Sequence, residues 1–235
     1  MRVTDRRPAL RVCAIVPAFD EAASVGEVVA GARCHVAEVV VVDDGSGDGT
    51  ADAAARAGAT VLRHEWNQGK GAAVRTGLAH VLARPCTHVL FMDADGQHDP
   101  ADIPALLDLA GRGPGDLVIG ERRFDRETMP ASRYYTNVIS STVISKFFVG
   151  ATVGDAQSGF RLVRASLLRD IRLTARGYEV ETEMLIKLRR RGAAVTRGQV
   201  KLRYEGARSK LKPLRDTTRT CFLAVRYRFF PERWA

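Results

Sequence analysis

The alternation of short valine-rich apolar runs with segments of helical periodicity constrains this fold more than any other feature. Five apolar runs predict strands buried on both faces, at residues 12–16, 39–42, 60–63, 88–92 and 117–119. Four segments between them predict helices, several opened by Ser, Thr or Asp, at residues 24–33, 50–57, 71–83 and 100–109. This order is typical of an α/β fold with a mostly parallel sheet and helices on both faces.

The regular alternation ends near residue 121. A polar, proline-containing stretch over residues 122–133 predicts a mobile loop, followed by a helix over 134–149. Further along, the pattern predicts a helix over residues 181–191 and a strand over 200–204. We expect one domain over residues 1–210 and a basic amphipathic helix over 211–235.

Carboxylates follow three of the predicted strands. The first strand leads into Asp20 and Glu21, the second into Asp43 and Asp44, and the fourth into the pair Asp93 and Asp95. In open α/β sheets, ligands bind beyond the carboxyl ends of the strands, so these side chains are expected at a ligand site. No G-x-G-x-x-G follows the first strand and no G-x-x-x-x-G-K-[ST] occurs, which excludes the usual glycine-rich phosphate loops.

Asp93 and Asp95 offer another way to hold phosphates. Two carboxylates at positions i and i+2 of an extended segment point the same way, so they can share one Mg²⁺ or Mn²⁺ whose shell substrate phosphates complete. An isolated D-x-D is also common in surface turns. Asp43 and Asp44 have an alternative role as helix caps, but Asp48 or Thr50 can cap the next helix, which leaves Asp43 and Asp44 for a base or ribose.

An ordered series of motifs resembles the family 2 glycosyltransferases of the GT-A fold, and more closely the dolichyl- and polyprenyl-phosphate sugar synthases. The series covers residues 11–215 and reads VPAFDE, VVVDDGSGDGT, NQGKGAAVRTG, FMDADGQHDP, VIGERR, DAQSGFR, ETEML and YEGARSK. Where the family usually has aromatic-Asn-Glu after its first proline, this chain has Phe19-Asp20-Glu21. The resemblance implies the GT-A fold and metal-dependent, inverting transfer of a hexose from a nucleotide sugar.

The resemblance also implies roles for individual residues. Pro17, Phe19, Glu21 and Asp43 would line the nucleotide site, with Asp44 beside them. The metal and the donor diphosphate would be held by Asp93, Asp95 and Gln97.

Other matched positions lie around the sugar and the acceptor. Arg122 and Arg133 would lie in the acceptor loop, and Ser209 and Lys210 in a segment that closes over the phosphates. Lys70 matches the family's GKG segment, although a solvated lysine at a helix start is an equally good reading. The run from Asp155 through Ser158 to Arg161 would contribute to the sugar and acceptor pocket, and either Glu181 or Glu183 would face the active site; a capped turn and an acidic first helical turn are the alternatives.

Positive charge is concentrated at the C-terminus. Residues 201–235 carry a net +7 of the chain's +9. On a helical wheel, Lys212, Arg215, Arg219 and Arg226 fall within about 60° of one another. An adjoining apolar face comprises Leu211, Leu214, Cys221, Phe222, Val225 and Phe229. This pattern is typical of a helix at an anionic membrane surface, or of a helix packed on the domain with a solvated basic edge.

No apolar stretch is long enough to predict a transmembrane helix, and four scattered cysteines indicate neither a disulfide framework nor a metal site. We therefore expect a cytoplasmic protein, peripheral on the inner face of the cell membrane, that uses a nucleotide-sugar donor and a polyprenyl phosphate acceptor. Two alternatives stay open: transfer to a soluble or polysaccharide hydroxyl, and a non-enzymatic nucleic-acid-binding protein. The sequence contains no nucleic-acid recognition module, which argues against the second alternative, and we expect no nucleic-acid partner.

Overall fold

The computed structural model describes residues 10–122, 155, 158–201, 220, 222, 223, 227 and 229, except for the side chain of Arg122. Within these residues, seven strands form one sheet: β1 (Val12–Ala18), β2 (Glu38–Asp43), β3 (Thr60–Arg63), β4 (His88–Phe91), β5 (Leu117–Arg122), β6 (Arg161–Arg164) and β7 (Val195–Val200). The helical elements are α1 (Val25–Arg33), α2 (Thr50–Arg56), α3 (Lys70–Leu82), η1 (Pro100–Asp102), α4 (Ile103–Arg112), α6 (Ala165–Arg169) and α7 (Val180–Arg190).

The sheet has the strand order β3-β2-β1-β4-β6-β5-β7. All neighbouring pairs are parallel except those of β6, which is antiparallel to both β4 and β5. Six strands therefore end at one edge of the sheet, and β6 begins there. This arrangement confirms the expected α/β fold with a mostly parallel sheet.

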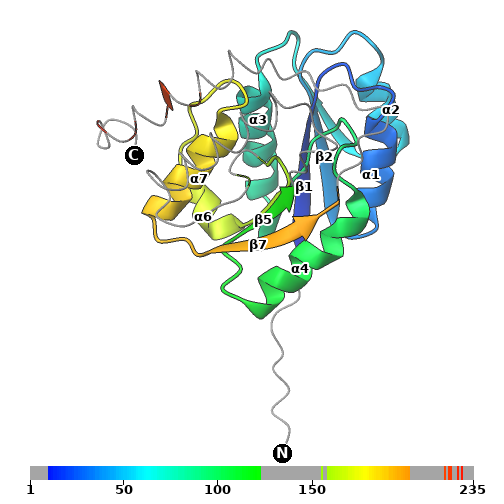
Figure 1. Cartoon of the computed structure of the whole chain (residues 1–235). Helices are drawn as coiled ribbons and strands as arrows, with labels where there is room; N and C mark the ends of the chain where they lie inside the picture. Colours follow the sequence, from blue (N-terminus) through cyan, green and yellow to red (C-terminus); the bar gives the residue numbers. More distant parts are fainter. Residues whose placement is uncertain are drawn as a thin grey trace, which may run out of the picture.

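Both faces of the sheet are covered by helices (Figure 1). Alternate residues of β1 point to opposite faces: Ile15 packs with α3, α6 and α7, whereas Ala14 packs with α1, α2 and α4. The two apolar cores are separate, and both Ile15 and Ala14 are fully buried. β1 is apolar throughout, and β2 is apolar between Glu38 and Asp43, which fits burial on both faces.

Most predicted elements match the structure to within three residues, and four features differ. The last described strand is β7 at Val195–Val200, which overlaps the predicted strand 200–204 only at Val200; Lys201 is not in a strand, and residues 202–204 lie outside the described residues. β7 lies at the sheet edge and is only partly buried, so it needs no apolar run. β3, at the other edge, is likewise not buried on both faces. The predicted helix 100–109 begins with the separate turn η1, and α6 was not predicted.

The predicted loop 122–133 and helix 134–149 lie almost wholly outside the described residues, as does most of residues 211–235. The division at residue 210 stays a prediction. Among the described residues, no helix combines the length and apolar character needed to cross a bilayer.

Candidate functional site

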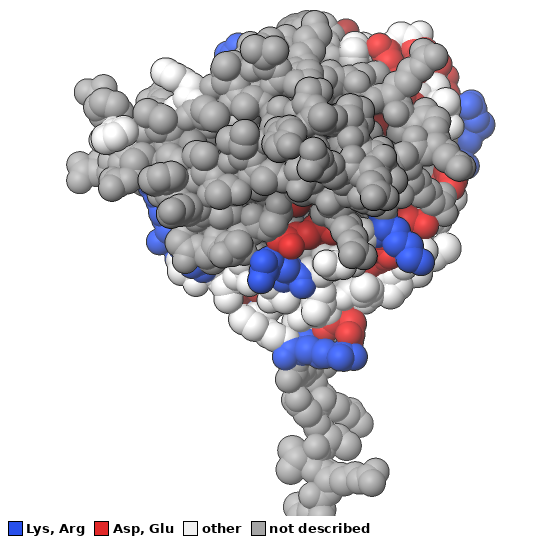
Figure 2. All heavy atoms as spheres, in the orientation of Figure 1, with Lys and Arg blue, Asp and Glu red and all other residues white. Residues whose placement is uncertain are grey.

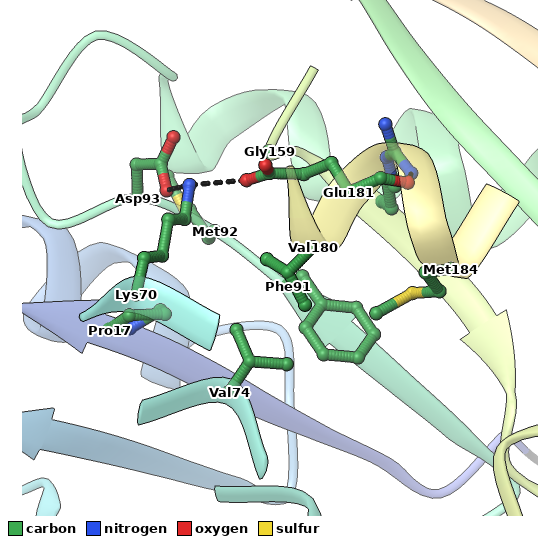
Figure 3. Close-up of a pocket in the computed structure, with 11 residues that line it drawn as sticks. Pro17, Lys70, Val74, Phe91, Met92, Asp93, Gly159, Val180, Glu181 and Met184 are labelled. Atoms are coloured by element: carbon green, nitrogen blue, oxygen red, sulfur yellow. Dashed lines mark hydrogen bonds and ion pairs between the residues drawn. The ribbon is translucent and has the colours of Figure 1, made fainter. Parts of the chain in front are cut away.

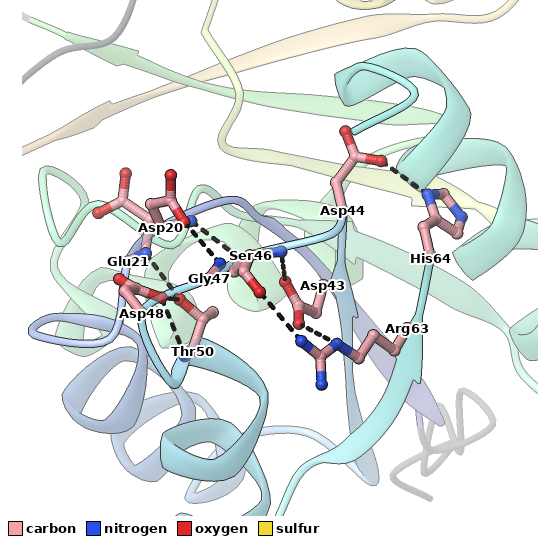
Figure 4. A network of polar contacts seen from close by, with 10 residues as sticks. All are labelled: Asp20, Glu21, Asp43, Asp44, Ser46, Gly47, Asp48, Thr50, Arg63 and His64. Carbon is pink, nitrogen blue, oxygen red and sulfur yellow. Dashed lines mark hydrogen bonds and ion pairs between the residues drawn. The ribbon is translucent and has the colours of Figure 1, made fainter. Parts of the chain in front are cut away.

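The first part of the site is a network that joins the loop after β1 to the loop after β2 (Figure 4). The backbone N–H of Asp20 donates to the Ser46 hydroxyl at 2.9 Å, and the N–H of Gly47 donates back to Asp20 Oδ1 at 3.0 Å. The N–H of Glu21 donates to the Thr50 hydroxyl at 2.8 Å. These reciprocal bonds fix the backbone of residues 19–21 against the end of β2, which carries Asp43.

Asp43 and Asp44 are both buried, and both use their carboxylates within the protein. Asp43 Oδ1 accepts the N–H of Ser46 at 3.0 Å, and Asp43 Oδ2 lies 3.3 Å from Nε of Arg63. Asp48, rather than either of them, accepts the N–H of Thr50 at the start of α2, as one alternative anticipated.

Asp44 holds the loop that precedes α3. Its two oxygens accept the backbone N–H groups of Gln68 and Gly69 at 2.9 and 2.8 Å, and Oδ1 lies 2.7 Å from Nδ1 of His64. A buried carboxylate needs such partners, because burial without them is costly. The expectation that Asp44 is left for a base or ribose therefore does not match its contacts.

Lys70 lies at the centre of the second part of the site (Figure 3). It is the first residue of α3, and its Nζ lies 2.5 Å from both Asp93 Oδ1 and Glu181 Oε1. Asp93 follows β4, and Glu181 lies in the first turn of α7. Three elements that are distant in the sequence thus bring one cation and two carboxylates together beside Pro17, at a pocket also lined by Gly159 and Arg161.

The charged groups in this cluster shift one another's pKa values. Burial alone would lower the pKa of Lys70, but Asp93 and Glu181 outweigh it and hold that pKa above its ordinary value. Burial raises the pKa of Glu181, and Lys70 offsets only part of that rise. Burial, followed by repulsion from Asp93, raises the pKa of Asp95 to about 6.

The turn before β6 closes the pocket. Arg161 is fully buried; its Nε donates to the Ser158 carbonyl at 2.6 Å and its Nη1 to the Glu181 carbonyl at 2.5 Å. Ser158 donates its hydroxyl to the Gly120 carbonyl at 2.7 Å, so it joins this turn to β5. Gly159 leaves room for Asp93: a Cβ there would lie 2.5 Å from Asp93 Oδ2.

The donor set suits a hard divalent cation. Asp93 and Asp95 both carry carboxylates, and the charge of Asp93 contributes to the raised pKa of Asp95. The N–H of Gln97 donates to Asp95 Oδ1 at 3.0 Å. The described residues contain no group of three or more His, Cys, Asp or Glu side chains arranged around a metal position. Mg²⁺ and Mn²⁺ are commonly held by one or two carboxylates with substrate phosphates completing the shell, so the chemistry of Asp93 and Asp95 fits the ion.

The two glutamates of α7 have different surroundings. Glu181 contacts Lys70, whereas Glu183 is turned away from the pocket and its carboxylate accepts hydrogen bonds from Thr174 and Ala175. The resemblance left open whether Glu181 or Glu183 faces the site, and the contacts place Glu181 at the pocket and do not support Glu183 as a site residue. Residues i and i+2 of a helix lie on nearly opposite faces, and Nζ of Lys187, one turn after Glu183, lies 3.5 Å from the Glu183 carboxylate. That pairing was a sequence signal for assigning Glu181 to the pocket.

Several predicted site residues lie outside what the structure describes. Arg133, Ser209 and Lys210 are among the undescribed residues, and Arg122 is placed only as the last residue of β5. Phe19 and Glu21 follow the pocket-lining Pro17 in the loop after β1. Arg161 ends the run that the resemblance assigns to the sugar and acceptor pocket, and it lines the pocket beside Lys70.

Comparisons with known proteins show which proteins this chain resembles. The family model described as glycosyl transferase family 2 matches residues 13–172. The chain is 33% identical over 211 residues to glycosyltransferase AglJ of Haloferax volcanii, covering 87% of this chain and 68% of that protein. It is 34% identical over 199 residues to the undecaprenyl-phosphate mannosyltransferase of Micrococcus luteus, covering 79% and 81%.

A solved structure shares the fold. The glucosyl-3-phosphoglycerate synthase of Mycobacterium tuberculosis, in complex with Mn²⁺, uridine diphosphate and glucosyl-3-phosphoglycerate, superposes with a TM-score of 0.75 at 25% identity. The match covers 94% of this chain and 80% of that one.

Proposed function

Because this chain belongs to glycosyl transferase family 2, and is therefore a glycosyltransferase, we propose that it transfers a hexose from a nucleotide sugar to a polyprenyl phosphate, with inversion at the anomeric carbon. The observation that carries the proposal is the cluster of Lys70, Asp93 and Glu181 at the carboxyl edge of the sheet. Relatives named for undecaprenyl-phosphate and polyprenol-phosphate mannose transfer support the choice of acceptor.

The donor would lie along the ends of β1, β2 and β4. Pro17, Phe19, Glu21 and Asp43 would face the nucleoside, and Asp93, Asp95 and Gln97 would hold Mg²⁺ or Mn²⁺ with the diphosphate. A bound divalent cation would stabilise the negative charge that develops on the departing nucleoside diphosphate. Lys70 is already ionised beside Asp93 and would add a second positive charge there.

The acceptor needs cationic positioning more than it needs a base. A monoester phosphate has its second pKa near about 6, so at neutral pH it is largely a dianion and already nucleophilic. Arg122, Arg133, Ser209 and Lys210 are proposed to hold that phosphate and to reduce its repulsion from the donor diphosphate. Their placement rests on the family resemblance.

A lipid acceptor implies contact with the membrane, which we place at the cytoplasmic face. The exposed fractions of Phe222 and Phe229 are 70% and 69%, whereas Tyr227 is buried on the body. The C-terminal helical segment, described at Thr220, Phe222, Leu223, Tyr227 and Phe229, thus has one packed side and one apolar exposed side. An outward apolar face in a segment whose sequence is rich in arginine supports interfacial binding to anionic lipid.

A panel of sugar nucleotides, each assayed with Mg²⁺ or Mn²⁺ and with or without polyprenyl phosphate, tests the proposal. We expect hexosyl transfer that depends on both the metal and the lipid phosphate. Including 3-phosphoglycerate as an acceptor tests the chemistry of the structurally similar synthase. Transfer to that hydroxyl, with none to lipid phosphate, would replace the proposed acceptor.

A second measurement separates the two acceptor classes by mechanism. A hydroxyl must lose a proton as it attacks, and a positioned base typically contributes about 10²–10⁴-fold. With a phosphate acceptor, we expect Asp155→Asn, Glu181→Gln and Glu183→Gln each to lower kcat only modestly, and Arg122→Ala or Arg133→Ala to lower it more. A fall of about a thousandfold for one carboxylate variant, with donor and metal affinity intact, would favour a hydroxyl acceptor.

A further inference from the structure

The carboxylate of Glu183 gathers contacts from two distant parts of the chain. Glu183 is fully buried, and its Oε2 accepts the backbone N–H groups of Thr174 and Ala175 at 2.9 and 2.7 Å. Its Oε1 accepts the Thr174 hydroxyl at 2.8 Å and the Tyr227 hydroxyl at 2.7 Å. One side chain thus joins the C-terminal helical segment to residues 174–175.

Residues 175–176 in turn hold the start of α3. The N–H of Gly71 donates to the Arg176 carbonyl at 2.8 Å, and Nη1 of Arg75 donates to the Ala175 carbonyl at 2.5 Å. The approach is so close that a Cβ on Gly71 would lie 2.1 Å from the Ala175 carbonyl oxygen. A shift of this segment therefore moves the first turn of α3, because no side chain separates the two backbones.

Lys70 is the residue that such a shift displaces. It precedes Gly71, and its Nζ lies 2.5 Å from both Asp93 and Glu181. An ammonium held between two carboxylates is sensitive to small movements, since charge-assisted hydrogen bonds depend on short distances. The contacts therefore run without a gap from Tyr227 to the charged cluster.

We propose that the Tyr227 hydroxyl is a positioning group for Lys70, acting through Glu183 and residues 174–176. Docking of the C-terminal helical segment on the body would then set the geometry of the charged cluster. The catalytic consequence rests on the role proposed above for Lys70, but the structural linkage does not depend on which substrate is used.

The aromatic ring of Tyr227 has anchors of its own, so its hydroxyl can be tested separately. Lys187 Nζ and the Arg190 guanidinium lie 5.4 and 5.6 Å from the ring centroid, and Arg190 donates to the Tyr227 backbone carbonyl. Tyr227→Phe keeps these contacts and removes only the bond to Glu183. The matched control is Thr60→Val, which removes a hydroxyl bonded to Glu38 at 3.0 Å on the edge strand β3.

Hydrogen–deuterium exchange of the substrate-free protein is the first measurement. In Tyr227→Phe we expect amide exchange to quicken about fivefold over residues 68–73 as well as 174–177, which is the scale of one lost hydrogen bond. Thr60→Val should leave both segments unchanged. Faster exchange confined to 174–177, or equal effects of the two variants, would overturn the proposal.

Steady-state kinetics with the working donor and acceptor give the second readout. We expect Tyr227→Phe to lower kcat about fivefold while the donor KM changes less than about twofold, because the reacting charges rather than the binding surface are displaced. Thr60→Val should keep both constants. If exchange responds as expected but no polyprenyl phosphate is glycosylated, the linkage stands and the proposed function fails.

Thr174→Val serves as a second variant if Tyr227→Phe does not fold. It removes the other hydroxyl on Oε1 of Glu183. It should produce the same exchange pattern over residues 68–73, and combining it with Tyr227→Phe should give less than the sum of the two effects, because both act on one carboxylate. No change over residues 68–73 in a folded Thr174→Val variant would also overturn the proposal.

Discussion

At the scale of single residues, the site is built from charges that the fold makes costly to bury. Burial and repulsion from Asp93 raise the pKa of Asp95 to about 6, so the folded protein disfavours the ionised form of this carboxyl. Glycine at position 159 lets Asp93 lie against the turn before β6. A ligand that supplies positive charge would reduce the repulsion between Asp93 and Asp95 and favour their ionised forms, as expected of a site organised for binding rather than for stability.

Asp95→Asn should abolish metal-dependent nucleotide binding and lower transfer by at least about a hundredfold, because the variant loses one of two proposed metal-ligating carboxylates. Its melting temperature without metal should not fall, since the replaced carboxylate was disfavoured by burial. Thermal shift with a nucleoside diphosphate and Mn²⁺, together with the transfer assay, measures both effects. The control is Asp108→Asn, which alters an exposed carboxylate on α4. Near-normal turnover of Asp95→Asn would remove this residue from the mechanism.

Gly159→Ala should displace Asp93, because its new Cβ would lie 2.5 Å from Oδ2 and 2.9 Å from Cγ of that side chain. We expect transfer to fall by more than about tenfold, as is usual when reacting groups are misplaced. Gly111→Ala is the matched control: nothing lies within 4 Å of its new Cβ, and alanine in a helix should add about 0.5–1 kcal/mol of stability. Full activity of Gly159→Ala would show that the position of Asp93 is not critical.

At the scale of elements, the first turn of α7 separates two roles. Glu181 lies on the side that meets α3 and the pocket, and Glu183 lies on the side that holds residues 174–175. Burial would raise the pKa of Glu183, but hydrogen bonds from Ala175, Tyr227 and Thr174 outweigh it and lower that pKa below its ordinary value. A carboxyl with a depressed pKa stabilises the fold above its unfolded-state pKa, and this contribution is lost as the pH falls through the folded-state pKa.

Glu183→Gln should lower the free energy of unfolding at pH 7 by about 1.5–3 kcal/mol, since hydrogen bonds to a charged acceptor are lost. The difference from the parent protein should shrink as the pH falls below the ordinary glutamate pKa of 4.5. Urea denaturation at pH 7 and at pH 4 tests whether the difference in the free energy of unfolding shrinks towards low pH. The control is Asp170→Asn, an exposed acidic residue after α6, which should follow the parent protein at both pH values. A difference that is constant or grows towards low pH would contradict the assignment.

At the scale of the whole molecule, charge is unevenly divided. Residues 1–200 carry a net +2 and residues 201–235 a net +7. On the face shown in Figure 2, the described Lys and Arg side chains lie in separate groups next to acidic ones. Attraction to an anionic surface is therefore expected to come mainly from the C-terminal region, where Phe222 and Phe229 are exposed.

Replacing Lys212, Arg215, Arg219 and Arg226 by Gln should weaken binding to anionic vesicles by roughly two to three orders of magnitude, at about 1 kcal/mol per basic residue. Binding of the parent protein should also weaken with added salt. A variant with Phe222→Ser and Phe229→Ser should bind less tightly but keep the salt dependence, because its charges are unchanged. Vesicle flotation measures the binding of the parent protein and of both variants, at low and at high salt. Binding to neutral vesicles that salt does not affect would contradict the electrostatic part.

Most elements and their order could be predicted from the sequence alone, because buried strands are runs of apolar residues and capped helices begin with particular residues. The short helix α6 and the bounds of the edge strand β7 could not, since neither forms such a run. The sequence also placed Asp93 and Asp95 at a strand end, since parallel strands finish at one edge. The sequence could not pair Lys70 with Glu181, which are joined only when α3 and α7 pack on the same face of the sheet. Nor could the sequence show that Asp44 and Glu183 hold loops. A carboxylate that faces a ligand and one that is buried against backbone N–H groups are the same residue type in the sequence. Which of them must be paired is decided by burial, and burial is a property of the tertiary structure.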